Sequence, residues 1–374
     1  MAEEERFLST PTLTDDALRD LRNRIGTPIT TAHPQPYVTR ASADAIRHWC
    51  YGIGDYNPLY LNEDYALAGP YQGLTAPPSF LYAFDKRVTG GVMGLPGITG
   101  MFAGVRWEWH RPVREDDAIR IESAVLKDVI EREGKFAGRQ FQVISEIKLV
   151  DADGNLVATS NPYGFRMGRK EAGGSAKYQS HQPYHYSPQE LDQIWDIVEA
   201  EWRRGSAPLT ADSLRVGDEL GPIIRGPLTT SDIIVFLMGW GGQYLRSHGD
   251  WIAWARRHPD GILRNSIGVP DCIEAVHWDQ ELAHKVGVPA AYDYGPQRVA
   301  WATTLVTNWM GDAARLAWLE LSLRRHVLIG DAIWISGTVR QITTDGGETA
   351  VDLDLSMRNQ QDEMVAAGSA HVVL

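Results

Sequence analysis

The two halves of this 374-residue chain repeat each other at one constant spacing. Arg111-Pro112-Val113, followed by Asp117-Ala118-Ile119, reappears 214 residues later as Arg325-His326-Val327, followed by Asp331-Ala332-Ile333. A period this long indicates a duplicated domain and not a solenoid of short repeats. The chain is also long enough for two domains of ordinary size, each with its own buried core.

The boundary between the two halves is predicted from composition. Residues 169–186 begin with a polar, glycine-rich stretch that is typical of a linker, which leaves an N-terminal domain at residues 1–168 and a C-terminal domain at residues 187–374. Ser187-Pro188-Gln189-Glu190 has the pattern of a capping box with proline at the first helical position. Residues 246–270 are interpreted as an insertion in the second half.

Helices are expected to precede strands in each half. In the second half, Gly295-Pro296 is expected to open a helix that Gly311 closes. This helix is apolar over most of its circumference and should therefore be buried. Alternating apolar residues predict strands, and these lie around residues 105–109, 119–121, 141–149, 319–323, 333–335 and 351–355.

One motif occurs twice, in altered form each time. The first copy is Gly54-Asp55-Tyr56-Asn57-Pro58-Leu59-Tyr60, followed by Asn62. The second is Val276-His277-Trp278-Asp279, with Cys272 at the place of the first aspartate. Each copy therefore keeps chemical groups that the other has lost.

This pattern resembles the signature of MaoC-like (R)-specific enoyl-CoA hydratases, in which G-D-x-N-P-[LI]-H continues into x-D-x-x-x-A. In that family the aspartate and the histidine five residues later form a dyad that activates water. A glycine at the start of the central helix donates its N–H to the thioester carbonyl. The resemblance covers nearly the whole chain, and it implies an α+β double hotdog fold, with two antiparallel sheets that each wrap a central helix.

The resemblance implies five catalytic candidates, and these are Asp55, Asn57, Tyr60, His277 and Gly295. A free N–H at a helix start can stabilise an enolate oxygen, because the helix dipole is positive there. Gly295 follows His277 by 18 residues. The matching position after Tyr60 is a proline, Pro78, which has no N–H to donate.

Several of these residues also have a simpler interpretation. Asp55 and Asn57 stand beside a proline, where such residues often only form turns. Tyr60 is a poor base near neutral pH, since the ordinary pKa of tyrosine is about 10. The carboxylate partner of His277 is left open by the sequence. The carboxylate candidates are Asp271, Asp279 and, from the other half, Asp55, while Gln243 aligns with Asp55 on an upstream register.

Polar residues around the second motif and the central helix are predicted to border the substrate. They are Asp279, Tyr292, Asp293, Gln297 and Arg298, although Asp293 and Arg298 could instead form an ion pair with each other. The candidates for contacts with coenzyme A phosphates are Arg111, Arg114, Arg324 and Arg325, for which solvated charges at strand ends are the alternative.

Composition excludes several classes of function. The net charge of −12 and the lack of a strong basic cluster argue against a nucleic-acid partner. Two cysteines fit a reduced, cytoplasmic setting, and the first residues lack the apolar stretch of a signal peptide. No run approaches the roughly 20 apolar residues that cross a bilayer. No metal-ligand spacing or phosphate-binding glycine loop is present, so neither a metal nor another cofactor is expected.

The first functional hypothesis is an acyl-CoA hydratase or dehydratase with one working site. In this hypothesis the remnants from both halves meet around one thioester pocket, and the other half lends space for a bulky acyl group. The alternatives are a non-catalytic acyl-CoA-binding subunit of a larger complex and a hotdog thioesterase. A homo-oligomer, for example a dimer, is expected, because hotdog proteins usually associate.

Overall fold

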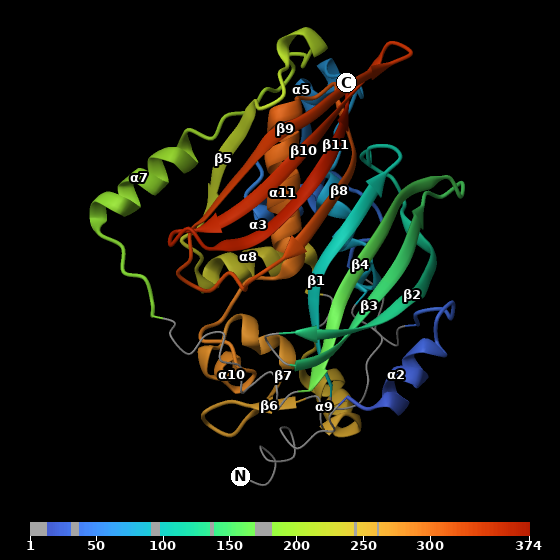
Figure 1. Cartoon of the computed structure of the whole chain (residues 1–374), viewed down its shortest axis with the longest axis vertical. Coiled ribbons are helices and arrows are strands. Elements are labelled where there is room, and N and C mark those ends of the chain that lie inside the picture. Colours follow the sequence, from blue (N-terminus) through green and yellow to red (C-terminus); the bar gives the residue numbers. More distant parts are fainter. Residues whose placement is uncertain are drawn as a thin grey trace.

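The computed structural model describes residues 13–30, 37–90, 98–134, 138–168, 182–242, 245–259 and 262–374. In the described part of the chain, nine strands form one antiparallel sheet in the order β2-β3-β4-β1-β8-β11-β10-β9-β5. Figure 1 shows this sheet curving around the helix α11, with the two halves of the chain side by side. A separate hairpin pairs β6 with β7.

The first half runs from helices into four strands. Its helices are α2 (Asp15–Arg22), α3 (Ala43–Ile53), α4 (Pro58–Leu61) and α5 (Glu63–Ala68), followed by the 3-10 segments η1 (Pro78–Ala83) and η2 (Lys86–Thr89). Its strands are β1 (Ile98–Trp109), β2 (Arg120–Gly134), β3 (Gly138–Val150) and β4 (Leu156–Gly168).

The second half repeats this plan with additions. Its helical elements are α7 (Pro188–Glu199), η4 (Ala211–Ser213), α8 (Thr230–Trp240), α9 (His248–Arg257), η6 (Ile273–His277), α10 (Gln280–Lys285) and α11 (Gly295–Met310). Its strands are β5 (Glu219–Arg225), β6 (Ile262–Arg264), β7 (Pro270–Cys272), β8 (Arg315–Leu323), β9 (Ile333–Asp345), β10 (Glu348–Asn359) and β11 (Met364–Val373). The strands and the central helix predicted from periodicity are confirmed, and the predicted insertion supplies α9 and most of the β6–β7 hairpin.

The prediction of two separate sheets is wrong in one respect, because hydrogen bonds join them into one. Strand β1 of the first half pairs with β8 of the second, with Val105 opposite Leu321 and Trp107 opposite Leu319. Pairing satisfies the backbone N–H and C=O groups that an unpaired edge would leave open. The two halves therefore share a continuous surface on which a site can be built.

Helix α11 is the centre of the molecule. All its residues from Pro296 to Met310 are buried, and Gly311 ends it with a φ of 75°, a conformation that suits glycine. Its apolar side chains pack into the main core together with residues of β1, β8 and β9. The helix is apolar over most of its circumference because other parts of the core surround it.

The first half has no equivalent of this long helix in its described residues, and this differs from the prediction that both halves wrap one. The corresponding segment consists of the short elements η1 and η2. The side chain of Asp85 accepts a hydrogen bond from the N–H of Arg87. This cap begins η2 as a segment separate from η1. Gly90, with a φ of 65°, then ends it. Local capping thus divides what is one continuous helix in the second half.

The proposed boundaries, residues 1–168, 169–186 and 187–374, stay a prediction. Strand β4 ends at Gly168, and α7 begins at Pro188 with the expected capping box between Ser187 and Glu190. The linker residues 169–181 lie outside the described residues. Among the helices that are described, none combines the length and the apolar character needed to span a membrane.

Candidate active site

A cavity of about 360 Å³ lies between the two halves. The second half contributes the segment before α11, the end of η6 and the residues that follow β8. The first half contributes the end of η2 and parts of β1, β3 and β4, among them Met101, Phe102 and Met167. His277 and Gly295 both line this cavity. The structure therefore brings together two of the five predicted catalytic residues.

The imidazole of His277 is held in one tautomer. Its Nδ1 lies 2.8 Å from the carbonyl oxygen of Tyr292, and a carbonyl can only accept, so Nδ1 carries the proton. Nε2 then keeps its lone pair. The ring stacks on Tyr294 with centroids 3.7 Å apart. Burial lowers the pKa of His277 to about 4, the two backbone hydrogen bonds oppose this, and the charge of Arg298 adds to it. The ring is therefore a neutral base at physiological pH.

Gly295 is the first residue of α11, and Tyr294 before it offers no side-chain cap. In the described residues no hydrogen bond uses the Gly295 N–H, as expected for the first turn of a helix. A Cβ at this position would lie 2.3 Å from Cδ1 of Phe102 and 3.1 Å from Cδ1 of Leu323. Only a glycine therefore fits between the helix start and the two strands.

Glu274 was not predicted as a site residue, and it lines the same cavity. Its Oε2 lies 3.9 Å from Nε2 of His277, and 20% of its side chain is exposed. Burial raises the pKa of Glu274 to about 7, and a contact with Tyr294 opposes the shift. The motif alignment contained the signal, because Glu274 stands opposite Asn57 when His277 is set opposite Tyr60.

The raised pKa of Glu274 predicts a pH-dependent stability. A carboxyl group whose pKa is raised on folding stabilises the folded state below its ordinary pKa, and this contribution is lost as pH rises through the folded value. We expect stability to fall between about pH 4.5 and about pH 7, by on the order of 1–3 kcal/mol. Denaturant unfolding of the wild type and Glu274→Gln across this range measures it. If the free energies of unfolding of the two proteins change with pH in the same way, the raised pKa of Glu274 is contradicted.

Three of the predicted substrate-binding residues line the cavity: Tyr292, Asp293 and Arg298. Asp293 and Arg298 form the buried ion pair that the sequence left as an alternative, with Oδ2 and Nε 2.7 Å apart. Burial raises the pKa of Asp293 to about 6, and Arg298 opposes this shift. Arg298 also donates to the carbonyl of Arg325 at 2.5 Å. This pair therefore links the start of α11 to the segment that follows β8.

Asp279 and Gln297 are not among the described residues that line the cavity. The side chain of Asp279 caps α10 by accepting from the N–H of Leu282 at 3.0 Å. Asn62 caps α5 in the same way by accepting from Tyr65 at 2.9 Å, which supports the alignment of the two motif copies. Gln297 is buried on α11, with only 2% of its surface exposed. The prediction that these two residues border the substrate is thus not supported by their positions.

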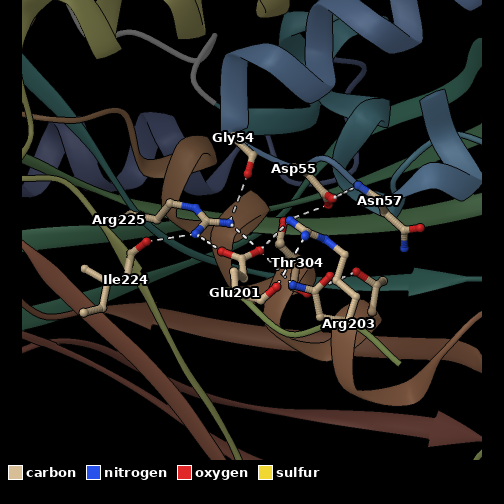
Figure 2. A network of polar contacts seen from close by, with 10 residues as sticks. Gly54, Asp55, Asn57, Glu201, Arg203, Ile224, Arg225 and Thr304 are labelled. Carbon is tan, nitrogen blue, oxygen red and sulfur yellow. Dashed lines mark hydrogen bonds and ion pairs between the residues drawn. The ribbon is translucent and has the colours of Figure 1, made fainter. Parts of the chain in front are cut away.

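Asp55 lies in a different environment, shown in Figure 2. Its carboxylate accepts from the N–H of Asn57 at 3.1 Å and from the hydroxyl of Thr304 on α11 at 3.0 Å. Beside it, Arg225 pairs with Glu201 at 2.5 Å and donates to the carbonyl of Gly54 at 3.2 Å. Burial raises the pKa of Asp55, and these hydrogen bonds and the nearby arginines oppose the shift. This is the geometry of a turn anchored to the central helix.

Asn57 and Tyr60 line a second, much smaller cavity of about 60 Å³. Asn57 caps α4 by accepting from the N–H of Leu59 at 3.0 Å. Pro78 and the C-terminal part of α11, including Thr307, line this cavity too. Residues that correspond in the two motif copies therefore face equivalent cavities, and the copy with tyrosine and proline is almost filled.

The structure does not bring Asp55 to His277. The two cavities lie at opposite ends of α11, and Asp55 bonds to Thr304 while Gly295 starts the helix. At 1.5 Å per residue, these two helix positions are about 14 Å apart. The expectation that remnants of both copies meet around one pocket is therefore wrong. The helix stands between them.

The other open partners of His277 do not replace Asp55. Asp279 is engaged as a helix cap, and neither Asp271 nor Cys272 lines the large cavity among the described residues. Gln243 lies outside the described residues. Burial raises the pKa of the Cys272 thiol to about 12, so this residue does not supply the missing negative charge.

The four arginines considered for coenzyme A fall into two groups. Arg324 and Arg325 line the large cavity, and Arg325 also pairs with Glu363 at 3.0 Å. Arg111 is occupied by ion pairs with Asp117 at 2.6 Å and with Asp151, and it lines only the small cavity. Arg114 is close in sequence to Arg111, and its backbone forms an isolated antiparallel β-bridge with Thr75. Only the first pair is in position for the large cavity.

We predict that Asp55→Asn mainly lowers stability. The substitution disturbs a buried acceptor of two hydrogen bonds, so the free energy of unfolding should fall by on the order of 1–3 kcal/mol. Denaturant unfolding measures this, with Thr304→Val as the matched control that removes one of the bonds. A large loss of catalytic turnover at unchanged stability would instead indicate that Asp55 has a catalytic role.

Two halves of similar strand plan, joined into one antiparallel sheet that curves around the buried helix α11, define a double hotdog protein. A MaoC-like dehydratase superposes with a TM-score of 0.64 at 16% identity, covering 94% of this chain and 99% of that one. A conserved hypothetical protein of Mycobacterium tuberculosis, described as having a double hotdog fold, superposes with a TM-score of 0.53 at 11% identity over 92% of this chain and 96% of its own. The predicted α+β double hotdog fold is confirmed.

Residues 28–160 match the family described as FAS1-like, dehydratase domain region. A probable enoyl-CoA hydratase alpha subunit of Thermomonospora curvata is 28% identical over 132 residues, which are 30% of this chain and 41% of that protein. This chain spans 41% to 66% of the length of the curated relatives it matches. Together these matches confirm the resemblance to MaoC-like dehydratases. The matched family region lies in the first half, whereas His277 and Gly295 lie in the second.

Proposed function

We propose that this chain is a hydratase or dehydratase that acts on a 2-enoyl or 3-hydroxyacyl thioester of coenzyme A. One observation carries the proposal: a neutral imidazole and the first N–H of a buried helix line the same cavity. In the described residues no group of three metal-ligating side chains is found. In this proposal the proton transfers are assigned to side chains that line the cavity.

His277 acts as the base in this proposal. Its Nε2 lone pair takes a proton from water as the oxygen attacks C3 of the enoyl thioester. Electrons move to the thioester carbonyl, which becomes an enolate oxygen. The N–H of Gly295 at the positive end of α11 stabilises that oxygen. Dehydration runs through the same steps in reverse.

The acyl group is proposed to be bulky. The cavity of about 360 Å³ is within the usual range for ligand sites, and both halves supply apolar walls. Met101 and Phe102 come from β1, Met167 comes from β4, and Val276 and Val288 come from the second half. This supports the hypothesis that the first half, with its own site nearly filled, lends space to the second. Arg324 and Arg325 at the cavity are the proposed contacts for coenzyme A phosphates.

The proposal is tested with the purified chain and a panel of trans-2-enoyl-CoA thioesters of increasing acyl size, including ring-bearing ones. Loss of absorbance of the conjugated thioester measures hydration, and free thiol measures hydrolysis. We expect hydration that is faster for bulky than for short acyl groups. Release of coenzyme A without hydration would favour the thioesterase alternative. Tight binding without turnover would favour a non-catalytic subunit, and turnover only with a co-expressed partner would favour a subunit of a larger enzyme.

The remaining expectations stay predictions. These are a cytoplasmic location, a homo-oligomer, the lack of a nucleic-acid partner and the lack of a cofactor. Sedimentation of the purified chain tests the oligomeric state directly.

A further inference from the structure

The cavity contains a second titratable group that the proposed mechanism has not used. Glu274 and His277 lie on the same short element, η6, and both side chains face the cavity. Their nearest polar atoms, Oε2 and Nε2, are 3.9 Å apart. This separation is too long for a direct hydrogen bond and leaves both atoms within reach of one small molecule between them. Nδ1 points the other way, toward Tyr292.

We propose that Glu274 is the catalytic acid that exchanges a proton with the α-carbon of the thioester, while His277 handles the proton of water. This inference rests on the proposed hydratase or dehydratase function. It differs from the dyad implied by the resemblance, in which the carboxylate stands at the position of Asp55 and Cys272. Here the carboxyl group stands at the position of Asn57, two residues further along the motif.

The surroundings of the two groups favour a neutral pair. Burial raises the pKa of Glu274 to about 7 and lowers that of His277 to about 4. The ordinary order of a carboxylic acid and an imidazole is therefore reversed. Glu274 is a protonated acid, and His277 a free base, between these two values. The two groups hold the roles that the reaction needs before the substrate binds.

Titratable and charged groups of the neighbouring elements lie near this pair. Tyr294, before α11, contacts Glu274 through its hydroxyl and His277 through its ring. Arg298 on α11 adds a positive charge near His277, and its partner Asp293 offsets part of that charge. The Cys272 thiol of β7 is kept neutral by its own raised pKa of about 12. From the first half and the loop after β8, the cavity is also lined by Arg166, Arg324, Arg325 and His326.

The proton and electron balance closes with these two residues alone. Water loses a proton to Nε2 of His277 while its oxygen bonds to C3, and the C2–C3 π electrons move toward the thioester. Glu274 then gives its proton to C2, and the enolate returns to a thioester carbonyl. The site is left with imidazolium and carboxylate. Transfer of one proton from Nε2 to the Glu274 carboxylate through a water molecule between them restores the starting state.

The test compares wild type, Glu274→Gln and Glu274→Asp with one enoyl-CoA substrate that the wild type hydrates. For Glu274→Gln we expect kcat to fall by about 10²–10⁴-fold, the usual contribution of a positioned acid or base, with KM within a few fold of wild type. The wild-type pH profile should decline above about pH 7, where Glu274 loses its proton. Glu274→Asp keeps an acid and should recover part of the rate, with the decline shifted in pH.

Deuterium incorporation at C2 gives a second readout. In deuterated water, Glu274→Gln should lose deuterium incorporation at C2 together with turnover. If Glu274 has only a structural role, the residual activity of the variant should keep the pH profile of the wild type. Circular dichroism and thermal unfolding verify that each variant is folded. If Glu274→Gln fails to fold, the Glu274→Asp pH profile decides alone.

Two failures can be told apart. If the wild type hydrates the substrate and Glu274→Gln keeps kcat within threefold with an unshifted profile, the role of Glu274 is overturned and the proposed function stands. If the folded wild type hydrates or dehydrates no thioester of the panel, the proposed function fails and this inference fails with it.

Discussion

Replacing His277 by alanine is expected to lower kcat for enoyl-CoA hydration by about 10²–10⁴-fold, with KM changed much less. The substitution removes the Nε2 lone pair that we propose as the base, while the apolar walls that we propose to hold the acyl group stay in place. Steady-state kinetics with a substrate of the wild type measure the effect. The binding constant of the variant should stay close to that of the wild type.

Two variants make this result specific. His277→Asn offers an amide N–H where Nδ1 now donates to the Tyr292 carbonyl, so it keeps the local contact but has no base. It should be as inactive as the alanine variant. His284 is the matched control, since it is an exposed histidine on α10 whose Nε2 contacts the carbonyl of Pro289 at 2.6 Å. His284→Ala should leave kcat within a few fold. A similar loss in both positions would argue against a special role of His277.

Removal of the Gly295 N–H is expected to cost about 10²–10³-fold in kcat, the usual effect of losing one oxyanion donor. Gly295→Pro removes the N–H and copies Pro78, the residue at the equivalent position of the first half. A Cβ at Gly295 also collides with Phe102, however, so this substitution changes two things at once.

A paired design separates the donor from the collision. In the background Phe102→Ala, which takes away the ring that the new Cβ would meet, Gly295→Ala keeps the N–H and Gly295→Pro removes it. We expect kcat of the alanine double variant to stay close to that of Phe102→Ala alone. The kcat of the proline double variant should fall by about 10²–10³-fold, the whole effect expected for loss of the oxyanion donor. Equal rates in the two double variants would exclude the N–H as the oxyanion donor.

Much of the fold could be read from the chain. The 214-residue offset predicted the duplication, and alternating apolar residues predicted strands that β1, β3, β8, β9 and β10 now contain. The bounds of α11 followed from Gly295 at its start and Gly311 at its end. These features depend on local periodicity and turn chemistry, which neighbours in the sequence determine.

The candidate site could be predicted only in part. His277 and Gly295 were predicted from the resemblance to the MaoC-like signature, whose matching positions both lie in the second half of the chain. The signature does not indicate Glu274, because its aspartate aligns with Cys272 and the carboxyl group near His277 stands two residues further on. Asp55 was included because its sequence string was the more complete one, yet its contacts are those of an anchor for α11.

Local patterns in the chain were sufficient to predict the repeat and the order of strands and helices, and the family resemblance added His277 and Gly295. Three features became visible only in the folded chain: β1 and β8 join the halves, the two motif copies face opposite ends of α11, and Glu274 approaches the imidazole where Asp55 does not. The physical reason is that burial and separation in space depend on how distant segments pack. One buried helix of 16 residues keeps apart two motifs that the sequence alone could not place relative to each other.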